Sequence, residues 1–301
     1  MNDIAKNIKS IVVVGSGTMG LGIAQVAAMG GFETRLFDIS EEQLAKAYAR
    51  IEGNINKGVK LGKVDKDHGE AGLSRLSTTT DLDAALEASD MLIEAIPERM
   101  ELKRDLFSRA DRLMKPEAIL ATNTTGLSIT EIGHATERPD KVIGMHFFNP
   151  VHIMKLVEII RSKNTSNETF TAIEAVSHQM GKETVEVNES AGFVTSRINA
   201  LIGNEAFRMW EAGVAEPEDI DKALKLGLNH PMGPFELVDL VGLDVRAAST
   251  GNLREHLGEM YEPCQIILDL VAAGRLGKKT GQGVYRYDEN NKRIPGSATR
   301  P

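Results

Sequence analysis

The chain has 301 residues, 42% of them hydrophobic, and carries 43 Asp and Glu against 35 Lys and Arg, a net charge of −8. An acidic chain is a poor partner for nucleic acid or an anionic membrane, and we expect neither. No apolar run approaches the roughly 20 residues of a membrane-spanning helix, and the first residues, "MNDIAKNIKS", lack the apolar core of a signal peptide. We therefore expect a cytoplasmic, globular protein of about two domains.

Short β-branched segments alternate with longer helical ones from residue 10 onward, the pattern of βαβ units that build a parallel sheet. Ser40 is placed to cap a long helix, and Ser128 with Glu131 has the spacing of a capping box, which predicts a short helix there. The expected strands cover residues 10–15, 33–38, 90–96, 118–123 and 142–147. The long helix is expected over residues 40–64, and two further helices are expected over residues 18–31 and 99–114.

Two further strands complete this first part of the chain. The apolar segment 154–160 follows a turn that contains Asn149 and Pro150, and we expect it to return antiparallel to the strand before it. A last strand is expected over 183–188. The sequence therefore predicts an α/β domain with a doubly wound sheet over residues 1–188.

The remaining chain shows helical periodicity alone over residues 192–275. Pro217 is well placed near a helix start, because its fixed φ suits the first helical turn. The expected helices cover residues 193–213, 216–227 and 233–258. We predict a separate all-α domain over residues 189–301, whose polar end, "ENNKRIPGSATRP", is disordered.

A glycine-rich turn, "VVVGSGTMGLG", joins the first strand to the first helix as G-x-G-x-x-G. The first glycine permits the tight turn, the second lets backbone approach a pyrophosphate, and the third packs the helix on the strand. The N-terminus of the helix adds N–H groups and a positive dipole end. A glycine turn without a nucleotide is the alternative. The expected pyrophosphate contacts are Gly15, Ser16, Gly17, Thr18, Met19 and Gly20.

Asp38 ends the second expected strand, eighteen residues after Gly20, where an acid can accept hydrogen bonds from both ribose hydroxyls. An acid there disfavours the extra phosphate of NADP, and the following "ISEE" offers no arginine to bind one. The sequence therefore predicts a Rossmann-type domain that binds NAD. A plain strand-end cap is the alternative for Asp38.

Two segments, "AIPERMELK" and "ATNTTG", follow strands whose carboxyl ends should border the cofactor. The candidates for ribose or nicotinamide contact are Ala95, Glu98 and Lys103 in the first segment and Asn123 in the second. For Glu98 and Lys103 the alternative is a helix-start acid and a solvated lysine.

His146 and Glu158 stand twelve residues apart in the apolar stretch "VIGMHFFNPVHIMKLVEII". Oxidising an alcohol with NAD requires a base for the hydroxyl proton, and histidine serves near neutral pH. If the stretch folds back on itself, the carboxylate lies beside the imidazole, fixes its tautomer and raises its basicity. A core histidine with a satisfied partner is the alternative. His146 is expected at the end of the fourth or fifth strand.

The other histidines lack metal-ligand spacing, so we expect no metal. The single cysteine, Cys264, cannot form an internal disulfide and is interpreted as a small hydrophobe on a helix.

Residues of about 8 to 287 together resemble the 3-hydroxyacyl-CoA dehydrogenases, especially the bacterial short-chain 3-hydroxybutyryl-CoA enzymes. The matching segments include "VVGSGTMGLGIAQ", "IEAIPERMELK", "ATNTTGLSITEI", "GMHFFNPVHIMKLVEII", "GFVTSRINALIGNEA" and "GKKTGQGVY". The resemblance implies interconversion of (S)-3-hydroxyacyl-CoA and 3-ketoacyl-CoA with NAD. It assigns His146 as catalytic base and Glu158 as its partner, and it brings Asn149 and Lys279 near the cofactor. It also implies a helical domain that borders the substrate and carries dimerisation.

Two positions depart from the family's pattern. Thr125 replaces a substrate-contacting serine, so a hydroxyl remains but the added methyl narrows the site. Ser196 replaces an asparagine that helps to polarise the substrate carbonyl; the shorter hydroxyl can still donate, directly or through water. We interpret both as variants of an active site.

Four lysines, Lys57, Lys60, Lys63 and Lys66, recur every three residues toward the end of the long helix. Such a basic stripe suits the phosphates of coenzyme A. A solvated face that complements the helix dipole is the alternative. Asn54, on the same helix, lies near a substrate contact of the family.

The sequence thus favours an NAD-dependent 3-hydroxyacyl-CoA dehydrogenase for short acyl chains, in fatty-acid or butyrate metabolism. An L-gulonate 3-dehydrogenase-like enzyme on a free hydroxy acid is the second reading, and a crystallin-type nucleotide-binding protein without turnover is the third. The apolar segments "INALIGNEAFRMW" and "FELVDLVGLDV" favour a homodimer.

Overall fold

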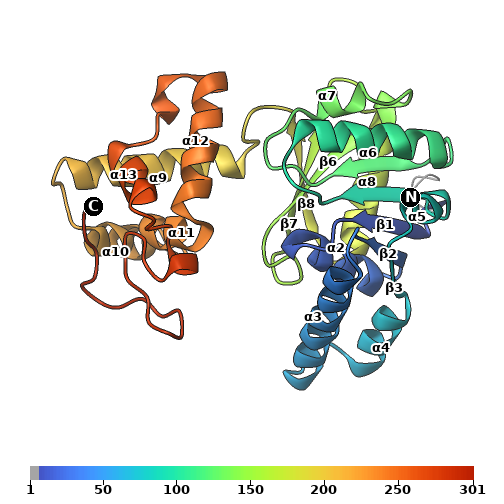
Figure 1. Cartoon of the computed structure of the whole chain (residues 1–301), viewed down its shortest axis with the longest axis horizontal. Coiled ribbons are helices and arrows are strands. Elements are labelled where there is room, and N and C mark those ends of the chain that lie inside the picture. The colour runs from blue at the N-terminus through green and yellow to red at the C-terminus, as the bar shows by residue number, and fades with distance from the viewer. Residues whose placement is uncertain (1–6) are drawn as a thin grey trace. The chain divides into compact units, whose positions relative to one another are not determined.

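The computed structural model describes residues 7–301, which form two compact units (Figure 1). The first unit extends to Ser190 and the second runs from Ala191 to Pro301. The division falls two residues beyond the junction expected after residue 188. Residues 1–6, part of the segment expected to lack a signal peptide, lie outside the described residues.

The first unit is built on an eight-stranded sheet in the order β3-β2-β1-β4-β5-β6-β7-β8. All neighbouring strands are parallel except β6 and β7, which are antiparallel, so the expected return of segment 154–160 is confirmed. The strands are β1 Ser10–Val14, β2 Glu33–Phe37, β3 Leu76–Thr79, β4 Met91–Glu94, β5 Ile119–Thr122, β6 Val142–Phe147, β7 Leu156–Arg161 and β8 Glu183–Asn188.

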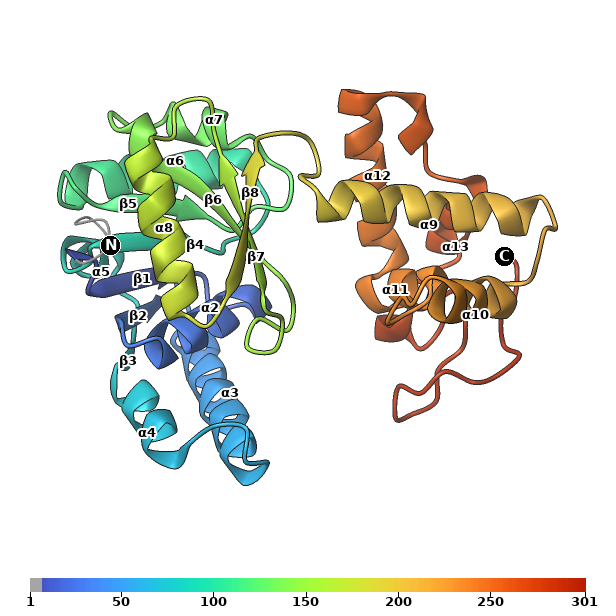
Figure 2. The ribbon, with the colours of Figure 1, turned by 180° about the vertical axis from the view of Figure 1, so that it is seen from behind.

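Helices cover both faces of this sheet (Figures 1 and 2). Side chains of β1 alternate between the faces, so Ile11 and Val13 join the core beneath α2, α3 and α8, and Val12 points to the opposite face. The first face carries α2 Thr18–Met29, α3 Glu41–Lys60 and α8 Asn167–Gln179, with α4 Lys66–Ser74 packed against α2 and α3. The other elements are α5 Leu82–Glu87, α6 Met100–Leu113, α7 Ile129–Gly133 and the short 3-10 turn η1 Pro139–Lys141. The doubly wound α/β prediction is therefore confirmed.

Several local expectations are corrected. The helix predicted over 40–64 ends at Lys60, because Gly62 adopts a left-handed φ of 65° and Asp65 caps a new helix. The strand β3 is short and mostly polar, so sequence patterning missed it, and His146 lies on the sixth strand instead of the fourth or fifth. Helices α4, α5 and α8 were also not predicted.

Two predicted helix starts are confirmed. The Oγ of Ser128 accepts a hydrogen bond from the backbone N of Glu131 at 3.1 Å at the start of α7. Pro217 is the first residue of α10. Local capping chemistry was therefore readable from the sequence alone.

The second unit is helical, with an aromatic core in which Phe235 packs edge-on against Phe207 at 4.9 Å and Trp210 at 5.8 Å between ring centroids. The single helix expected over 233–258 is wrong, because Gly242, with φ 110°, divides it into two helices. The elements are α9 Thr195–Glu211, α10 Pro217–Gly227, α11 Pro234–Val241, α12 Leu243–Leu257, η2 Glu259–Tyr261, α13 Gln265–Ala272 and η3 Lys278–Thr280.

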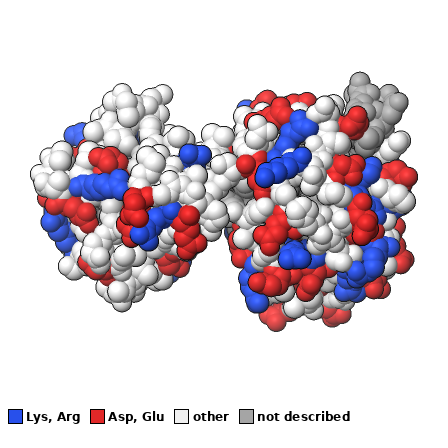
Figure 3. Space-filling view, turned by 90° about the horizontal axis from the view of Figure 1, so that it is seen from above, with Lys and Arg blue, Asp and Glu red and all other residues white. Residues whose placement is uncertain are grey.

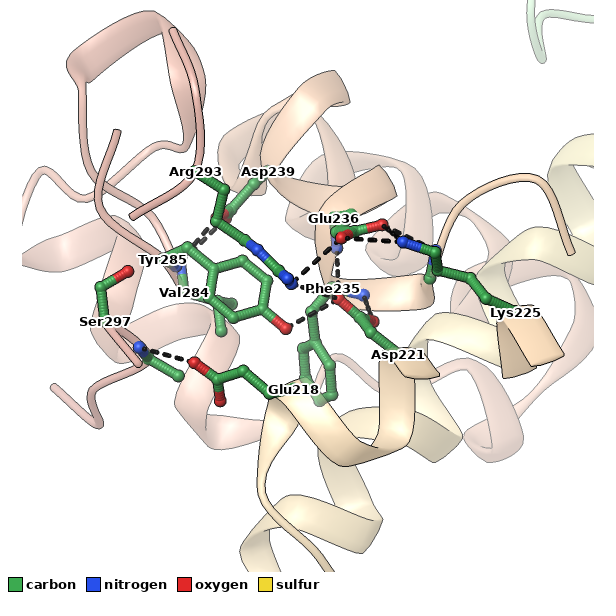
Figure 4. A network of polar contacts seen from close by, with 12 residues as sticks. Glu218, Asp221, Lys225, Phe235, Glu236, Asp239, Val284, Tyr285, Arg293 and Ser297 are labelled. Atoms are coloured by element: carbon green, nitrogen blue, oxygen red, sulfur yellow. Dashed lines mark hydrogen bonds and ion pairs between the residues drawn. The ribbon is translucent and has the colours of Figure 1, made fainter. Parts of the chain in front are cut away.

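The carboxyl-terminal residues 289–301, predicted to be disordered, contact the helical unit through several side chains, among them Arg293 (Figure 4). Arg293 lies 4.7 Å from the ring centre of Tyr285 and 3.0 Å from a carboxylate oxygen of Glu236. Ser297 is 2% exposed, and Arg300 donates to the carbonyl of Trp210 at 2.6 Å. Polar composition suggested disorder, but each of these side chains finds a partner on the helical unit.

Buried carboxylates organise the same region (Figure 4). Asp239 accepts from the backbone N of Val284 at 2.8 Å and of Tyr285 at 2.9 Å, and Asp221 accepts from the hydroxyl of Tyr285 at 2.7 Å. Burial raises the pKa of Asp221 to about 6. These acids hold the final segment of the chain against α10 and α11.

Among residues 7–301, no helix has the length and apolar character required to cross a membrane. On the face drawn in Figure 3, basic and acidic side chains are interspersed over the first unit and do not separate by sign.

Candidate active site

The carboxyl ends of β1, β2, β4, β5 and β6 lie at one edge of the sheet, because these strands are parallel. In doubly wound sheets ligands bind outside this edge. The predicted residues that follow or end these strands are Gly15 to Gly20, Asp38, Ala95, Glu98, Asn123, Thr125, His146 and Asn149. The sheet therefore collects most of the predicted first-unit site along one border.

The glycine turn has the shape that a pyrophosphate requires. Gly15 has φ 103°, and a Cβ on Gly20 would lie 1.7 Å from the carbonyl oxygen of Gly15, so both positions require glycine. A Cβ on Gly17 would meet nothing within 4 Å, which leaves open space over the turn. Gly17 also begins α2 with no side-chain cap and no acid in the first turn. Backbone N–H groups and the helix dipole are thus available to an anion.

Asp38 is held at the end of β2 by the same turn. Its Oδ2 accepts from the backbone N of Ser16 at 2.9 Å and from the hydroxyl of Ser16 at 2.7 Å, and its Oδ1 accepts from the backbone N of Ser40 at 3.2 Å. Burial opposes ionisation, but these donors lower the pKa of Asp38. The residue is therefore a fixed, ionised acid beside the glycine turn.

Two acidic side chains, Glu94 and Glu98, lie around Lys103 on α6. Its Nζ lies 2.6 Å from Oε1 of Glu94 and 3.1 Å from Oε2 of Glu98. Glu98 also accepts from the backbone N of Thr125 at 2.9 Å and from the hydroxyl of Thr124 at 2.5 Å. Burial opposes ionisation of Glu98, but the Lys103 charge and these donors lower its pKa. Lys103 is 1% exposed, so it is not the solvated lysine of the alternative reading.

Sequence reasoning missed Glu94. An acid at the end of the apolar strand "MLIE", nine residues before a lysine, was a signal that could have indicated a buried pair.

Asn123 and Thr125 follow β5. The side-chain Oδ1 of Asn123 accepts from the backbone N of Phe147 at 2.9 Å, which ties the end of β5 to the end of β6. The hydroxyl of Thr125 donates to Glu98 at 3.2 Å, and Thr125 is exposed. Both residues follow β5, and β5 is the neighbour in the sheet of β6, which carries His146.

His146 and Glu158 are directly opposite each other on β6 and β7. The Nδ1 of His146 lies 2.7 Å from Oε2 of Glu158, and the residues are 5% and 0% exposed. The ring of Phe148 packs 4.6 Å from the imidazole centre. A carboxyl oxygen that accepts at Nδ1 favours the tautomer with its proton on Nδ1. The folded-back geometry that the sequence suggested is thus present.

A buried lysine, missed by sequence reasoning, supports the loop that follows β6. The Nζ of Lys182 donates to the carbonyls of Val151 and Met154, the latter at 2.9 Å. Burial lowers the pKa of Lys182 to about 8. Asn149 is exposed in this loop, and Ala95 donates its backbone N to Val14 at 2.8 Å on the neighbouring strand.

Ser196 and Lys279 belong to the second unit. Ser196 lies in the first turn of α9 and is half-buried. The Nζ of Lys279 lies 2.6 Å from a carboxylate oxygen of Asp244. The sheet edge alone therefore does not gather the whole predicted set.

The expected lysine stripe does not lie on a single helix, because Lys63 is in the turn after α3 and Lys66 begins α4. Lys57 and Lys60 are exposed near the end of α3, but Lys63 and Lys66 lie beyond it. Asn54 donates its side-chain Nδ2 to Gln25 at 3.1 Å, which joins α3 to α2. Only the first two lysines share the face of α3 that was expected.

Residues 7–301 hold no cluster of His, Cys, Asp or Glu suited to a metal ion. Cys264 is buried at the start of α13, where its thiol donates to the carbonyl of Asn204 at 3.3 Å. Burial raises the pKa of this thiol to about 11, which opposes a nucleophilic role.

The glycine turn and Asp38 suit a dinucleotide, and a histidine held by a carboxylate at the same sheet edge suits proton transfer to or from an alcohol. These features define a class, the dinucleotide-dependent dehydrogenases. Comparison with known proteins then identifies the family. The NAD binding domain of 3-hydroxyacyl-CoA dehydrogenase matches residues 10–190, and the C-terminal domain of that enzyme matches residues 192–287. The chain belongs to the 3-hydroxyacyl-CoA dehydrogenase family and is an NAD-dependent oxidoreductase.

Three of the similar proteins match over nearly their whole length. A probable 3-hydroxybutyryl-CoA dehydrogenase of Bacillus subtilis is 44% identical, over 94% of this chain and 98% of that protein. The human mitochondrial hydroxyacyl-coenzyme A dehydrogenase is 41% identical, over 93% of this chain and 91% of that protein. The crystal structure of (S)-3-hydroxybutyryl-CoA dehydrogenase from Ralstonia eutropha has a TM-score of 0.90 and 41% identity, and covers 94% of this chain and 100% of its own.

The glycine turn allows a test that separates folding from cofactor binding. Gly17→Ala adds a Cβ into open space, so we expect an unchanged melting temperature but a dissociation constant for NADH raised at least about tenfold, since the pyrophosphate approaches there. Gly20→Ala drives a Cβ into the Gly15 carbonyl, so we expect loss of both stability and binding. Thermal unfolding and NADH fluorescence titration measure the two effects. Unchanged NADH affinity in Gly17→Ala would contradict this assignment.

Proposed function

We propose that the enzyme oxidises short-chain (S)-3-hydroxyacyl-CoA, with (S)-3-hydroxybutyryl-CoA as the reference substrate, to 3-ketoacyl-CoA, and that it catalyses the reverse reaction. The observation that carries the proposal is the 2.7 Å contact between His146 and Glu158 at the dinucleotide edge of the sheet. The names of the relatives support the acyl-CoA substrate.

His146 is the proposed catalytic base. Because its Nδ1 is bound to Glu158, the proton of the substrate hydroxyl passes to Nε2, and in the reverse direction Nε2 returns it to the developing alkoxide. The carboxylate of Glu158 stabilises the imidazolium that forms and keeps the ring in orientation. When bound, NAD supplies the acceptor for hydride from the carbon that carries the hydroxyl. No metal takes part in this proposal.

Thr125 and Ser196, the two positions that depart from the family's pattern, have proposed roles that depend on their side-chain hydroxyl groups. Thr125 contacts the substrate through the hydroxyl that lies 3.2 Å from Glu98, and its methyl narrows the acyl site. Ser196 donates to the substrate carbonyl directly or through one water. The proposed cofactor contacts are Gly15, Ser16, Gly17, Thr18, Met19, Gly20, Asp38, Ala95, Glu98, Lys103, Asn123, Asn149 and Lys279.

We also propose a homodimer that works in the cytoplasm. Support for association comes from exposed apolar side chains of the helical unit, where Ile198 is 54%, Leu240 51% and Val245 49% exposed. Sedimentation equilibrium at micromolar concentration measures the state.

A comparison of substrates tests the proposed function. We expect NADH oxidation with acetoacetyl-CoA and NAD reduction with (S)-3-hydroxybutyryl-CoA, each at a kcat/KM at least a hundredfold above that with L-gulonate. Turnover of L-gulonate alone would favour the free hydroxy acid reading. NADH binding without turnover of any of these substrates would favour the crystallin-type reading.

Replacement of the proposed base gives a second test. His146→Gln should lower kcat by about a thousandfold or more, because general acid-base catalysis is lost. Glu158→Gln should lower kcat less, because the imidazole remains but loses its charged partner. His134→Gln, on an exposed histidine of the same unit, is the control and should leave kcat unchanged. A loss below tenfold in a folded His146→Gln that binds NADH would remove His146 from the mechanism.

The divided lysine stripe supplies a matched test of coenzyme A recognition. In the double variant Lys57→Gln and Lys60→Gln, we expect KM for acetoacetyl-CoA to rise about fivefold, because each substitution removes a charge-assisted hydrogen bond to a phosphate of coenzyme A. The KM for NADH should not change. The control is Lys63→Gln with Lys66→Gln, whose side chains lie beyond α3. Equal effects of both pairs would indicate a general effect of charge instead of a site.

A further inference from the structure

Glu94 is a fully buried acid that the proposed reaction does not use. It ends β4, is 0% exposed, and both of its carboxylate oxygens are occupied. Oε1 accepts from the backbone N of Ile96 at 2.7 Å and from Nζ of Lys103 at 2.6 Å, and Oε2 accepts from the hydroxyl of Thr122 at 2.5 Å. Burial of a carboxylate is costly in free energy. The complete set of donors around Glu94 offsets that cost, and its presence requires an explanation.

The pairing fixes the ammonium of Lys103 in one place. A lysine side chain carries about 2 kcal/mol of rotamer entropy, and a buried partner on a central strand removes that freedom before any ligand binds. The ammonium has three N–H donors. One points to Glu94 and the ammonium lies 3.1 Å from Glu98, so two carboxylates set its orientation.

Lys103 connects two carboxylates of different exposure. Glu94 is enclosed in the sheet, whereas the side chain of Glu98 is 41% exposed in the loop before α6. Glu98 in turn binds the hydroxyl of Thr124 and the backbone N of Thr125. A displacement of Lys103 would therefore also move the loop that carries Thr125.

We propose that Glu94 is a positioning residue which, through Lys103, sets the dinucleotide-binding edge at the carboxyl ends of β4 and β5. The inference rests on the proposed roles of Lys103 and Glu98 at the cofactor. Glu94 itself touches neither cofactor nor substrate. Its contribution is to dinucleotide affinity, because it orders the lysine in advance, and it has little part in the proton transfer at His146.

The opposite end of the same strand provides a matched control. Asp90, which precedes β4, accepts from Nζ of Lys115 at 2.7 Å, from the hydroxyl of Ser10 at 2.8 Å and from the backbone N of Ser10 at 3.0 Å. It thus has the same three kinds of donor as Glu94 at the amino end of the strand. The side chain of Asp90 is 17% exposed, so Asp90→Asn tests the loss of a paired carboxylate on β4 away from the proposed cofactor edge.

The experiment measures the dissociation constant of NADH by fluorescence titration of the full chain without acyl substrate. Glu94→Gln is expected to raise this constant at least tenfold and to lower kcat, at saturating NADH and acetoacetyl-CoA, less than threefold. Asp90→Asn is expected to change the constant less than twofold. An NADH affinity within twofold of the parent in a folded Glu94→Gln, or an equal loss in Asp90→Asn, would overturn the proposal.

A double-mutant cycle tests whether the effect passes through Lys103. Lys103→Met should weaken NADH binding, and adding Glu94→Gln to it should change the constant less than twofold more. Independent, additive losses would overturn the route through Lys103. If Glu94→Gln does not fold, Thr122→Val decides, since it removes one donor of the Glu94 carboxylate: a loss of threefold or more supports the proposal, and an unchanged constant overturns it.

The measurement is also separate from the proposed function. NADH binding that depends on Glu94 in a protein without activity on acetoacetyl-CoA would sustain the inference and remove the substrate assignment. Activity with acetoacetyl-CoA, together with an NADH affinity that does not depend on Glu94, would sustain the substrate assignment and remove the inference about Glu94.

Discussion

The antiparallel pairing of β6 with β7 is the constraint on which the proposed chemistry depends. All five strands before β6 run parallel to it, and a further parallel strand would have needed a helical crossover between them. The chain instead turns within residues 148–155 and brings Glu158 opposite His146 in the ladder. A slip of one residue would turn the carboxylate to the other face. The register therefore decides whether the imidazole has its partner.

Charge in the first unit is arranged around the sheet edge that we propose as the dinucleotide site. The uncapped start of α2 presents positive dipole ends, and Asp38 is held ionised beside it by Ser16. Farther along the edge, Lys103 lies between Glu94 and Glu98. Burial makes each of these groups costly alone, so each is paired. The same pairing keeps the site in one geometry before ligands arrive.

The sequence was sufficient wherever a feature was local. The glycine turn, the helix N-cap at Ser128 and the alternation of strands and helices were each predicted from neighbouring residues. The failures were long-range or weakly patterned. Strand β3 is too polar to resemble a strand, and Arg293 of the final segment pairs with Glu236, which lies far back in the chain. The partners of Lys103 likewise depend on how β4 meets α6, which composition does not encode.

The most direct test of the central claim is the tautomer of His146, measured by nitrogen-15 NMR of protein labelled at histidine, at a pH where the imidazole is neutral. His146→Gln identifies the signal. The account predicts a proton on Nδ1, donated to Glu158, and an unprotonated Nε2 that can accept the substrate proton. A neutral ring with its proton on Nε2 would contradict it, because that nitrogen could not then act as the base.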